Sequence, residues 1–159
     1  MPIAESSIEI DAPISIVWEV MLDFPRYGEW NPFLHRIDAD GPARVGNRLR
    51  LYVRWPSGGG AQSGELVTRV DPPSEEPAVL EYVFTGLLDR IGAVRATRVQ
   101  SLTRVSSERT TYFTREVFSG WLTWALPLAK VQAGFAAHAQ AIRARSETLA
   151  AERRVKAGA

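Results

Sequence analysis

The chain has 159 residues, 45% hydrophobic and 23% charged, values typical of one soluble globular domain with a sizeable core. The absence of cysteine excludes disulfides, thiolate metal sites and a cysteine nucleophile, and it fits a cytoplasmic location. The net charge of +1, with arginines spread along the chain, gives no electrostatic basis for binding nucleic acid. We expect no signal peptide and no membrane span, because no apolar stretch approaches the required length.

The N-terminal region predicts a strand followed by short helices. Residues 3–10 partly alternate between apolar and polar side chains, as a half-buried strand does. Asp11-Ala12-Pro13 then indicates a helix start, in which Asp11 or a neighbour caps free amides and proline is tolerated. Pro25 ends this helix, because proline removes an amide donor. The apolar face of the helix and the crowded turn that follows contain Ile14, Val17, Trp18, Met21, Trp30, Asn31, Pro32 and Phe33.

From about residue 34 to 118 the chain predicts successive strands separated by turns. Three alternating runs define the strand faces: Leu49, Leu51, Val53 and Trp55 share one face, Leu66 and Val70 alternate with Glu65 and Arg69, and Leu80, Tyr82 and Phe84 alternate with Glu81. Short connections between such runs are typical of an antiparallel meander.

The last part of the chain changes to helical spacing. Apolar residues recur at three- and four-residue steps and predict one amphipathic helix from about 125 to 152, with a polar tail over 153–159 that we expect to fray. A sheet and a long helix with one apolar face each bury those faces best against one another. We therefore predict a single α+β domain over 1–152 with a helix-grip fold. In this fold a curved antiparallel sheet wraps a long C-terminal helix and leaves an apolar cavity.

Two separated motifs give the sequence a family resemblance. The opening, with Ile8–Pro13, Val17-Trp18 and Trp30–Phe33, resembles that of the SRPBCC superfamily, the START-like and Bet v 1-like proteins that include polyketide cyclase/dehydrase-like enzymes. The passage Glu116–Leu122 followed by Leu126-Pro127-Leu128 resembles that superfamily's step from last strand to long helix. The resemblance implies the same fold and a small-molecule pocket. It does not select among cyclases, lipid carriers, hormone binders, ring-hydroxylase subunits and co-chaperone-like proteins.

The last two strands are predicted to supply a polar wall of the pocket. By alternation Tyr112, Thr114, Glu116 and Phe118 share a face, as do Arg98, Gln100 and Leu102 in the preceding strand. Phe118 and the resemblance indicate that these faces point inward; the opposite parity would place Phe113, Arg115 and Val117 there. A buried glutamate and arginine need partners, so we expect an Arg98–Glu116 pair, either architectural or orienting a ligand. Relatives often carry histidines near positions 114 and 98, where this chain has Thr114 and Arg98.

His138 lies on the apolar stripe of the long helix, where relatives commonly have methionine. It is either a general acid/base that faces the ligand or a core histidine satisfied by nearby groups. We take His138, Glu116, Tyr112 and Arg98 as the candidate catalytic set, while His35 is expected at the rim. Candidate ligand-binding residues, several of which could equally be core packing, are Trp18, Trp30, Phe33, Trp55, Tyr82, Gln100, Thr114, Phe118 and Phe135.

Other chemistries lack a motif. Gly58-Gly59-Gly60 is not followed by the lysine of a phosphate-binding loop, two distant histidines make a poor metal site, and no Ser-His-Asp arrangement stands out. We expect no metal or cofactor, and a monomer or homodimer whose partner is a small hydrophobic or aromatic ligand. The leading hypothesis is a cyclase or dehydratase acting on a polyketide-like or aromatic substrate. The alternatives are a non-catalytic lipid or metabolite carrier and a co-chaperone-like interaction module.

Overall fold

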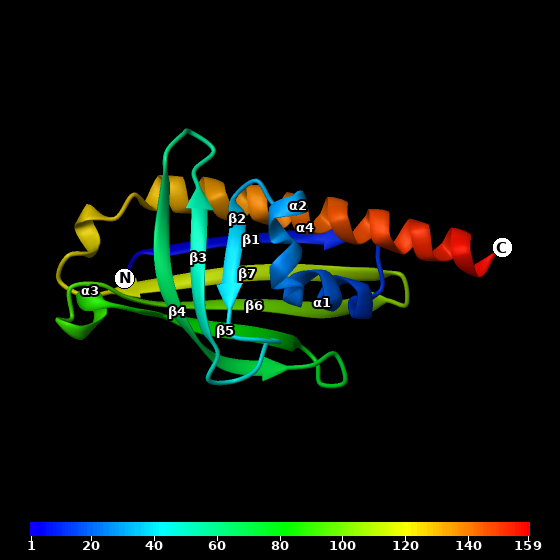
Figure 1. The fold of residues 1–159 in the computed structure, drawn as a ribbon, viewed down its shortest axis with the longest axis horizontal. Helices are drawn as coiled ribbons and strands as arrows, with labels where there is room; N and C mark the ends of the chain where they lie inside the picture. The colour runs from blue at the N-terminus through cyan, green and yellow to red at the C-terminus, as the bar shows by residue number, and fades with distance from the viewer.

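A seven-stranded antiparallel sheet curls around one long helix in the computed structural model, which describes all 159 residues (Figure 1). The spatial order of the strands is β1-β7-β6-β5-β4-β3-β2. The strands are β1 (Ile3–Ile10), β2 (Leu34–Ala39), β3 (Arg48–Arg54), β4 (Gly60–Asp71), β5 (Ala78–Thr85), β6 (Arg95–Ser106) and β7 (Arg109–Ser119). The helices are α1 (Ile14–Leu22), η1 (Phe24–Arg26), α2 (Tyr27–Trp30), α3 (Leu87–Arg90), η2 (Thr123–Ala125) and α4 (Leu128–Ala157). The predicted helix-grip fold is confirmed.

The sheet bends because its long strands carry irregularities. The ladder shifts register between Leu34 and Arg36, between Val67 and Arg69, and between Arg104 and Ser106. Such bulges increase the local twist and bend the strand that carries them. Figure 1 shows the result: β2, β3 and β4 run steeply across the direction of β1, β7 and β6. The concave face that this creates holds the core.

The beginning of α1 differs from the sequence prediction. Pro13 occupies the cap position and no side chain caps the helix, so the expected capping by Asp11 or a neighbour is wrong. The Asp11 carboxylate instead accepts a hydrogen bond from Arg109 Nε of β7 at 2.8 Å, and the Asp11 amide donates to the Glu147 carboxylate of α4 at 3.0 Å. The turn after β1 is therefore tied to the sheet and to the long helix.

The long helix is displaced toward the C-terminus relative to its predicted range of 125–152. It begins at Leu128, because Pro127 holds Leu126 in an extended conformation and Thr123–Ala125 form the separate η2 turn. It continues to Ala157, so the tail expected to fray is helical. Two ion pairs hold this end: Arg153 contacts Glu19 of α1 at 2.7 Å and Arg154 contacts Glu108 of the β6–β7 turn at 2.9 Å.

Helix α4 lies against β1 at the edge of the sheet as well as across the concave face. The Gln132 side-chain amide accepts a hydrogen bond from the Glu5 amide at 3.0 Å and donates one to the Glu5 carbonyl at 2.5 Å. Phe135, Ala139 and Ile142 of the same helix are buried in the core. No helix is long and apolar enough to cross a membrane.

Candidate functional site

A cavity of about 140 Å³ lies between the concave face of the sheet and the first turns of α4. Trp55, Ala61 and Val131 line it and are partly or fully exposed, so the cavity opens between the β3–β4 hairpin and α4. Its wall is mostly apolar but contains three ionisable side chains other than tyrosine. The complete lining is Phe33, Leu34, Leu51, Val53, Trp55, Ala61, Gln62, Ser63, Glu65, Tyr82, Arg98, Glu116, Phe118, Val131 and Phe135.

The strand register explains how charged residues reach this apolar space. Tyr82 of β5, Arg98 of β6 and Glu116 of β7 are consecutive cross-strand partners, so their side chains emerge from one row of the concave face. Arg98 and Tyr82 are buried, whereas Arg115 is exposed. The predicted inward parity of the last two strands is therefore observed, and the alternative parity is not.

Glu65 is the site residue that sequence reasoning missed. The alternation with Leu66 and Val70 suggested that Glu65 faces away from the core, yet it is buried and lines the cavity. Glu65 is the cross-strand partner of Leu49 and lies on the same inward face of the sheet. The register shift between Val67 and Arg69 changes the alternation, so that Val70 also lies on that face. Burial raises the pKa of Glu65 to about 8, against a smaller lowering by a hydrogen bond with Ser63. At neutral pH this carboxyl group is mostly protonated.

Arg98 is the only fully buried cation of the cavity wall. Its Nε donates to Thr114 Oγ1 at 3.1 Å, and its guanidinium carbon lies 4.1 Å from the centre of the Phe135 ring, within range of a cation–π contact. Burial would lower the pKa of Arg98, but nearby Tyr82, Tyr112 and Glu116 outweigh it and raise that pKa. The second guanidinium nitrogen, Nη2, is buried without a hydrogen-bond partner. An unpaired buried donor of this kind is uncommon in folded proteins.

The expected Arg98–Glu116 ion pair does not form. The two residues are cross-strand partners, but Thr114 and the Phe135 ring hold the guanidinium, and no ion-pair contact joins it to the carboxylate. Burial raises the pKa of Glu116, and the positive charge of Arg98 partly offsets that rise. Two carboxyl groups with raised pKa values thus line one cavity with an unpaired cationic donor.

His138 lies in the core behind this wall and is fully buried. Asn31 Oδ1 accepts hydrogen bonds from the amides of Phe33 and Leu34, both at 3.0 Å, which identifies the other end of that side chain as the NH₂ donor. Asn31 Nδ2 therefore donates to His138 Nδ1 at 2.7 Å, and His138 Nε2 carries the proton and donates to Gln100 Oε1 at 3.2 Å. Burial, and to a lesser extent Arg98, holds the pKa of His138 well below its usual value. Both ring nitrogens are satisfied by protein groups.

A hydrogen-bond chain links His138 to the cavity indirectly. Tyr112 donates its hydroxyl to Gln100 Oε1 at 2.8 Å, and Gln100 Nε2 donates to the Tyr82 hydroxyl at 3.5 Å. Of these residues only Tyr82 lines the cavity. Among the sequence-derived candidates, Phe33, Trp55, Tyr82, Arg98, Glu116, Phe118 and Phe135 line the cavity, whereas Trp18, Trp30, Gln100, Tyr112, Thr114 and His138 lie outside its lining. Trp30 packs on Tyr27 with ring centres 4.7 Å apart.

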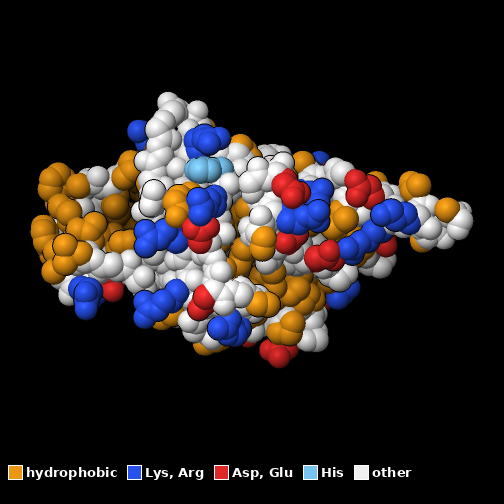
Figure 2. All heavy atoms as spheres, in the orientation of Figure 1, with side chains coloured by type: hydrophobic (Ala, Val, Ile, Leu, Met, Phe, Trp, Pro, Cys, Tyr) orange, Lys and Arg blue, Asp and Glu red, His pale blue; other side chains and the backbone are white.

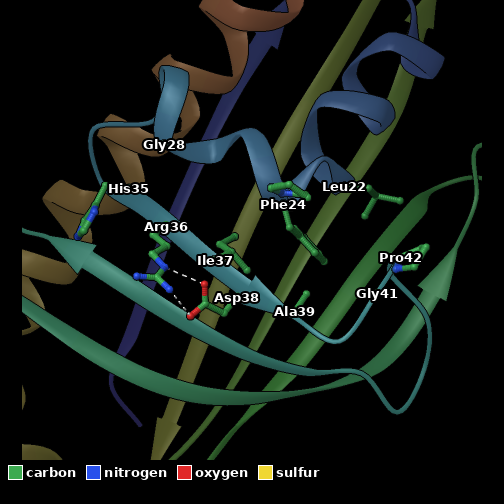
Figure 3. A pocket seen from close by; sticks show the side chains of 11 residues that line it. Leu22, Phe24, Gly28, His35, Arg36, Ile37, Asp38, Ala39, Gly41 and Pro42 are labelled. Atoms are coloured by element: carbon green, nitrogen blue, oxygen red, sulfur yellow. Dashed lines mark hydrogen bonds and ion pairs between the residues drawn. The ribbon is translucent and has the colours of Figure 1, made fainter.

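A larger hollow lies on the outside of the molecule, between β2 and the segment from α1 to α2 (Figure 3). It encloses about 860 Å³ and includes Phe24, Ile37 and the predicted rim residue His35. Its charged groups, Arg36 and Asp38, bind each other through two hydrogen bonds of 2.8 and 3.0 Å, drawn as dashed lines in Figure 3. The charged groups of this hollow are paired with each other, whereas the interior cavity contains the buried and incompletely paired Arg98, so we place the functional site in the interior cavity.

The curled sheet, the long helix and the cavity between them define a helix-grip protein. The chain belongs to the family described as polyketide cyclase / dehydrase and lipid transport, whose model matches residues 1–152. Among curated proteins, no sequence matches the chain.

Several solved structures share this fold. The ZhuI aromatase/cyclase from Streptomyces sp. R1128 superposes with a TM-score of 0.74 at 19% identity, covering 96% of this chain and 94% of that one. Norcoclaurine synthase from Thalictrum flavum gives 0.69 at 15% identity, covering 96% and 95%. A START superfamily protein from Mycobacterium smegmatis gives 0.69 at 18% identity, covering 94% and 99%. These likenesses establish the fold.

Proposed function

We propose that this protein is a cyclase or dehydratase that acts on a polyketide-like or aromatic substrate by proton transfer within the interior cavity. The observation that carries the proposal is the buried Arg98, whose Nη2 has no protein partner, on a wall shared with the carboxyl groups of Glu65 and Glu116. A non-catalytic carrier of apolar molecules needs no such convergence of ionisable groups, because each buried charge opposes folding. The family description and the aromatase/cyclase neighbour support the same reading.

The size of the cavity limits what enters it. At about 140 Å³ it holds roughly one six-membered ring, since a dry protein cavity of about 150 Å³ accommodates benzene. Most ligand pockets are larger, on the order of 300 Å³ or more. A longer substrate therefore places one reacting segment inside and leaves the rest at the opening formed by Trp55, Ala61 and Val131.

The three ionisable groups suit an intramolecular aldol reaction followed by loss of water. The positive charge of Arg98 on the cavity wall stabilises the enolate that forms when the Glu116 carboxylate removes a carbon-bound proton next to a substrate carbonyl. The carbon attacks a second carbonyl, and protonated Glu65 supplies a proton to the new alkoxide. Glu65 then removes a second carbon-bound proton and Glu116 protonates the departing hydroxyl. One water leaves, and both carboxyl groups return to their starting states.

His138 and Tyr112 contribute indirectly in this proposal. They fix the side chain of Gln100, which in turn holds the hydroxyl of Tyr82 on the cavity wall. Of the two alternatives that the sequence left for His138, the proposal takes the core histidine and assigns the acid/base role to Glu65 and Glu116. His138→Gln is then expected to lower turnover mainly through loss of positioning, less than Glu65→Gln does.

A synthetic linear poly-β-ketone thioester, analysed by mass spectrometry, tests the proposal. The wild-type protein should accelerate formation of a cyclised product lighter by one water, and Glu65→Gln, Glu116→Gln and Arg98→Met should each lower the rate by roughly 10²–10⁴-fold. Exposed Arg115→Gln is the matched control and should retain the full rate. A wild-type rate equal to that in buffer, combined with binding of phenol in the cavity, would overturn the catalytic proposal in favour of a carrier.

A further inference from the structure

One end of the molecule carries a cluster of large apolar side chains that are exposed to solvent. Trp121 and Trp124 are 65% and 81% exposed, and Leu87 and Ile91 are 71% and 54% exposed. Figure 2 shows hydrophobic side chains gathered at the end where Figure 1 places α3 and the segment before α4. The apolar end patch, as we name it, consists of Leu87, Leu88, Ile91, Trp121 and Trp124.

The backbone joins the two segments that carry the apolar end patch. The Leu122 amide donates to the Ala93 carbonyl at 2.9 Å, and the Ala93 amide donates to the Leu88 carbonyl at 2.8 Å. Gly120 fits this junction because a Cβ there would overlap the Ala93 backbone, and its φ of 118° suits glycine. The patch is thus a fixed surface, on which the two tryptophans and the apolar residues of α3 are held at one end of the molecule.

The two segments that carry the apolar end patch contain mostly positive charges. Residues 86–95 and 119–131 contain Arg90, Arg95 and Lys130 but only one acidic residue, Asp89. Arg95 contacts Asp89 at 3.9 Å, which leaves Arg90 and Lys130 without an ion pair. Hydrophobic side chains that include tryptophan, flanked by basic residues, have the composition of surfaces that bind anionic bilayers, where indole rings favour the headgroup region.

The geometry points to peripheral docking of this end on the surface of an anionic lipid bilayer. Each exposed tryptophan offers an apolar surface of more than 100 Å², and the whole patch is on the order of 500 Å². A patch of this size is in the upper part of the range of about 300–600 Å² for the largest apolar patch of a monomer, which is often functional, and it is smaller than the roughly 800 Å² per partner of a standard protein interface. The positive rim also opposes pairing of two identical patches, which favours the bilayer over a second copy of the chain.

The site of docking lies near the cavity. Phe118, which lines the cavity, is three residues before Trp121, and Val131, at the opening, follows the patch on the first turns of α4. An apolar molecule dissolved in the bilayer would meet the protein at the end that contains its cavity. The docking inference itself rests on the surface alone and does not depend on the proposed chemistry.

Co-sedimentation with lipid vesicles tests this inference. Wild-type protein should bind phosphatidylcholine–phosphatidylserine vesicles more tightly than pure phosphatidylcholine vesicles. Trp121→Ser/Trp124→Ser should weaken binding to both by at least about tenfold, because two apolar anchors are lost. Arg90→Gln/Lys130→Gln should weaken binding to the anionic vesicles alone, by about fivefold for each charge.

Matched variants separate docking from general effects of mutation. Val45→Ser/Val155→Ser removes exposed apolar side chains elsewhere, and Arg145→Gln/Lys156→Gln removes charges on α4 away from the patch. Both should bind vesicles like the wild type, as should Glu65→Gln. Equal binding by the tryptophan variant, with an unchanged circular dichroism spectrum, would overturn the inference. Failure of the wild type to bind anionic vesicles would also overturn it. So would analytical ultracentrifugation that finds the wild type dimeric and the tryptophan variant monomeric.

Discussion

Replacement of Glu65 by glutamine tests whether the cavity holds a carboxyl group that resists ionisation. Folding raises the pKa of Glu65 from 4.5 to about 8, principally through burial. Between these values the unfolded chain is ionised at Glu65 while the folded protein keeps the proton. The free energy of unfolding therefore falls as the pH rises through this window, by about 1.4 kcal/mol per pH unit. Glutamine keeps the shape and hydrogen-bonding capacity of the protonated acid but does not titrate.

The best range for the measurement is pH 6.5 to 8. Burial lowers the pKa of His138 from 6.5, which makes stability rise with pH near 6.5, but both proteins contain this histidine and its contribution cancels in their difference. Urea unfolding of wild type and Glu65→Gln, followed by circular dichroism, should show the stability of the wild type falling relative to the variant by about 2 kcal/mol over this range. The control Glu152→Gln, at an exposed position, should differ in stability from the wild type by the same amount at every pH in this range. If the difference in free energy of unfolding between the wild type and Glu65→Gln does not change with pH, the assignment of a buried, protonated Glu65 is refuted.

Three further predictions concern the core and the cavity. Asn31→Ala should destabilise the protein by about 2–4 kcal/mol in urea unfolding, because it leaves His138 Nδ1 and two backbone amides without partners. Asn31→Asp should raise the pKa of His138 in an NMR titration, because a carboxylate oxygen replaces the Nδ2 donor. An unchanged histidine titration in Asn31→Asp would contradict the assignment of the proton to Nε2. Gly134→Ala should destabilise the protein by about 1–3 kcal/mol despite its gain in helix propensity, because the new Cβ would overlap the buried Phe33 ring. The control Ala133→Gly, at an exposed position, should lose only about 1 kcal/mol. Equal stability of Gly134→Ala and wild type would show that the Phe33 ring can move. Trp55→Ala should strengthen binding of 2-naphthol relative to phenol, measured by calorimetry, by widening the opening, and an unchanged ratio would place the opening elsewhere.

The fold could be predicted because its determinants are local. The strand over residues 3–10 is marked by alternation, and the long helix by its change to helical spacing. The helix boundaries were less predictable, because the extension to Ala157 depends on ion pairs with Glu19 and Glu108, residues distant in sequence. Propensity and spacing carry no information about such contacts.

The candidate site was only partly predictable, and the reasons differ between residues. Alternation placed Arg98 on the inward face, because β6 and β7 pair regularly through this region. It failed at Glu65, because a bulge changes the side-chain parity of β4 and a bulge has no reliable sequence signal. For His138 the helical spacing predicted the correct face of the helix, but spacing could not show that Asn31 and Gln100 occupy both ring nitrogens.

The hydrogen bonds between Gln132 and the backbone of Glu5 bear on how this protein avoids aggregation. An open sheet has two free edges, and each is a template for pairing with another chain. At β1 the side chain of Gln132 occupies backbone groups that an incoming strand would use. At β2 the register shift and the charged pair of Arg36 and Asp38 make the edge irregular and hydrophilic. Loss of α4 would therefore do more than open the cavity: it would free one side of the sheet for strand exchange, and shortened chains should polymerise through β1.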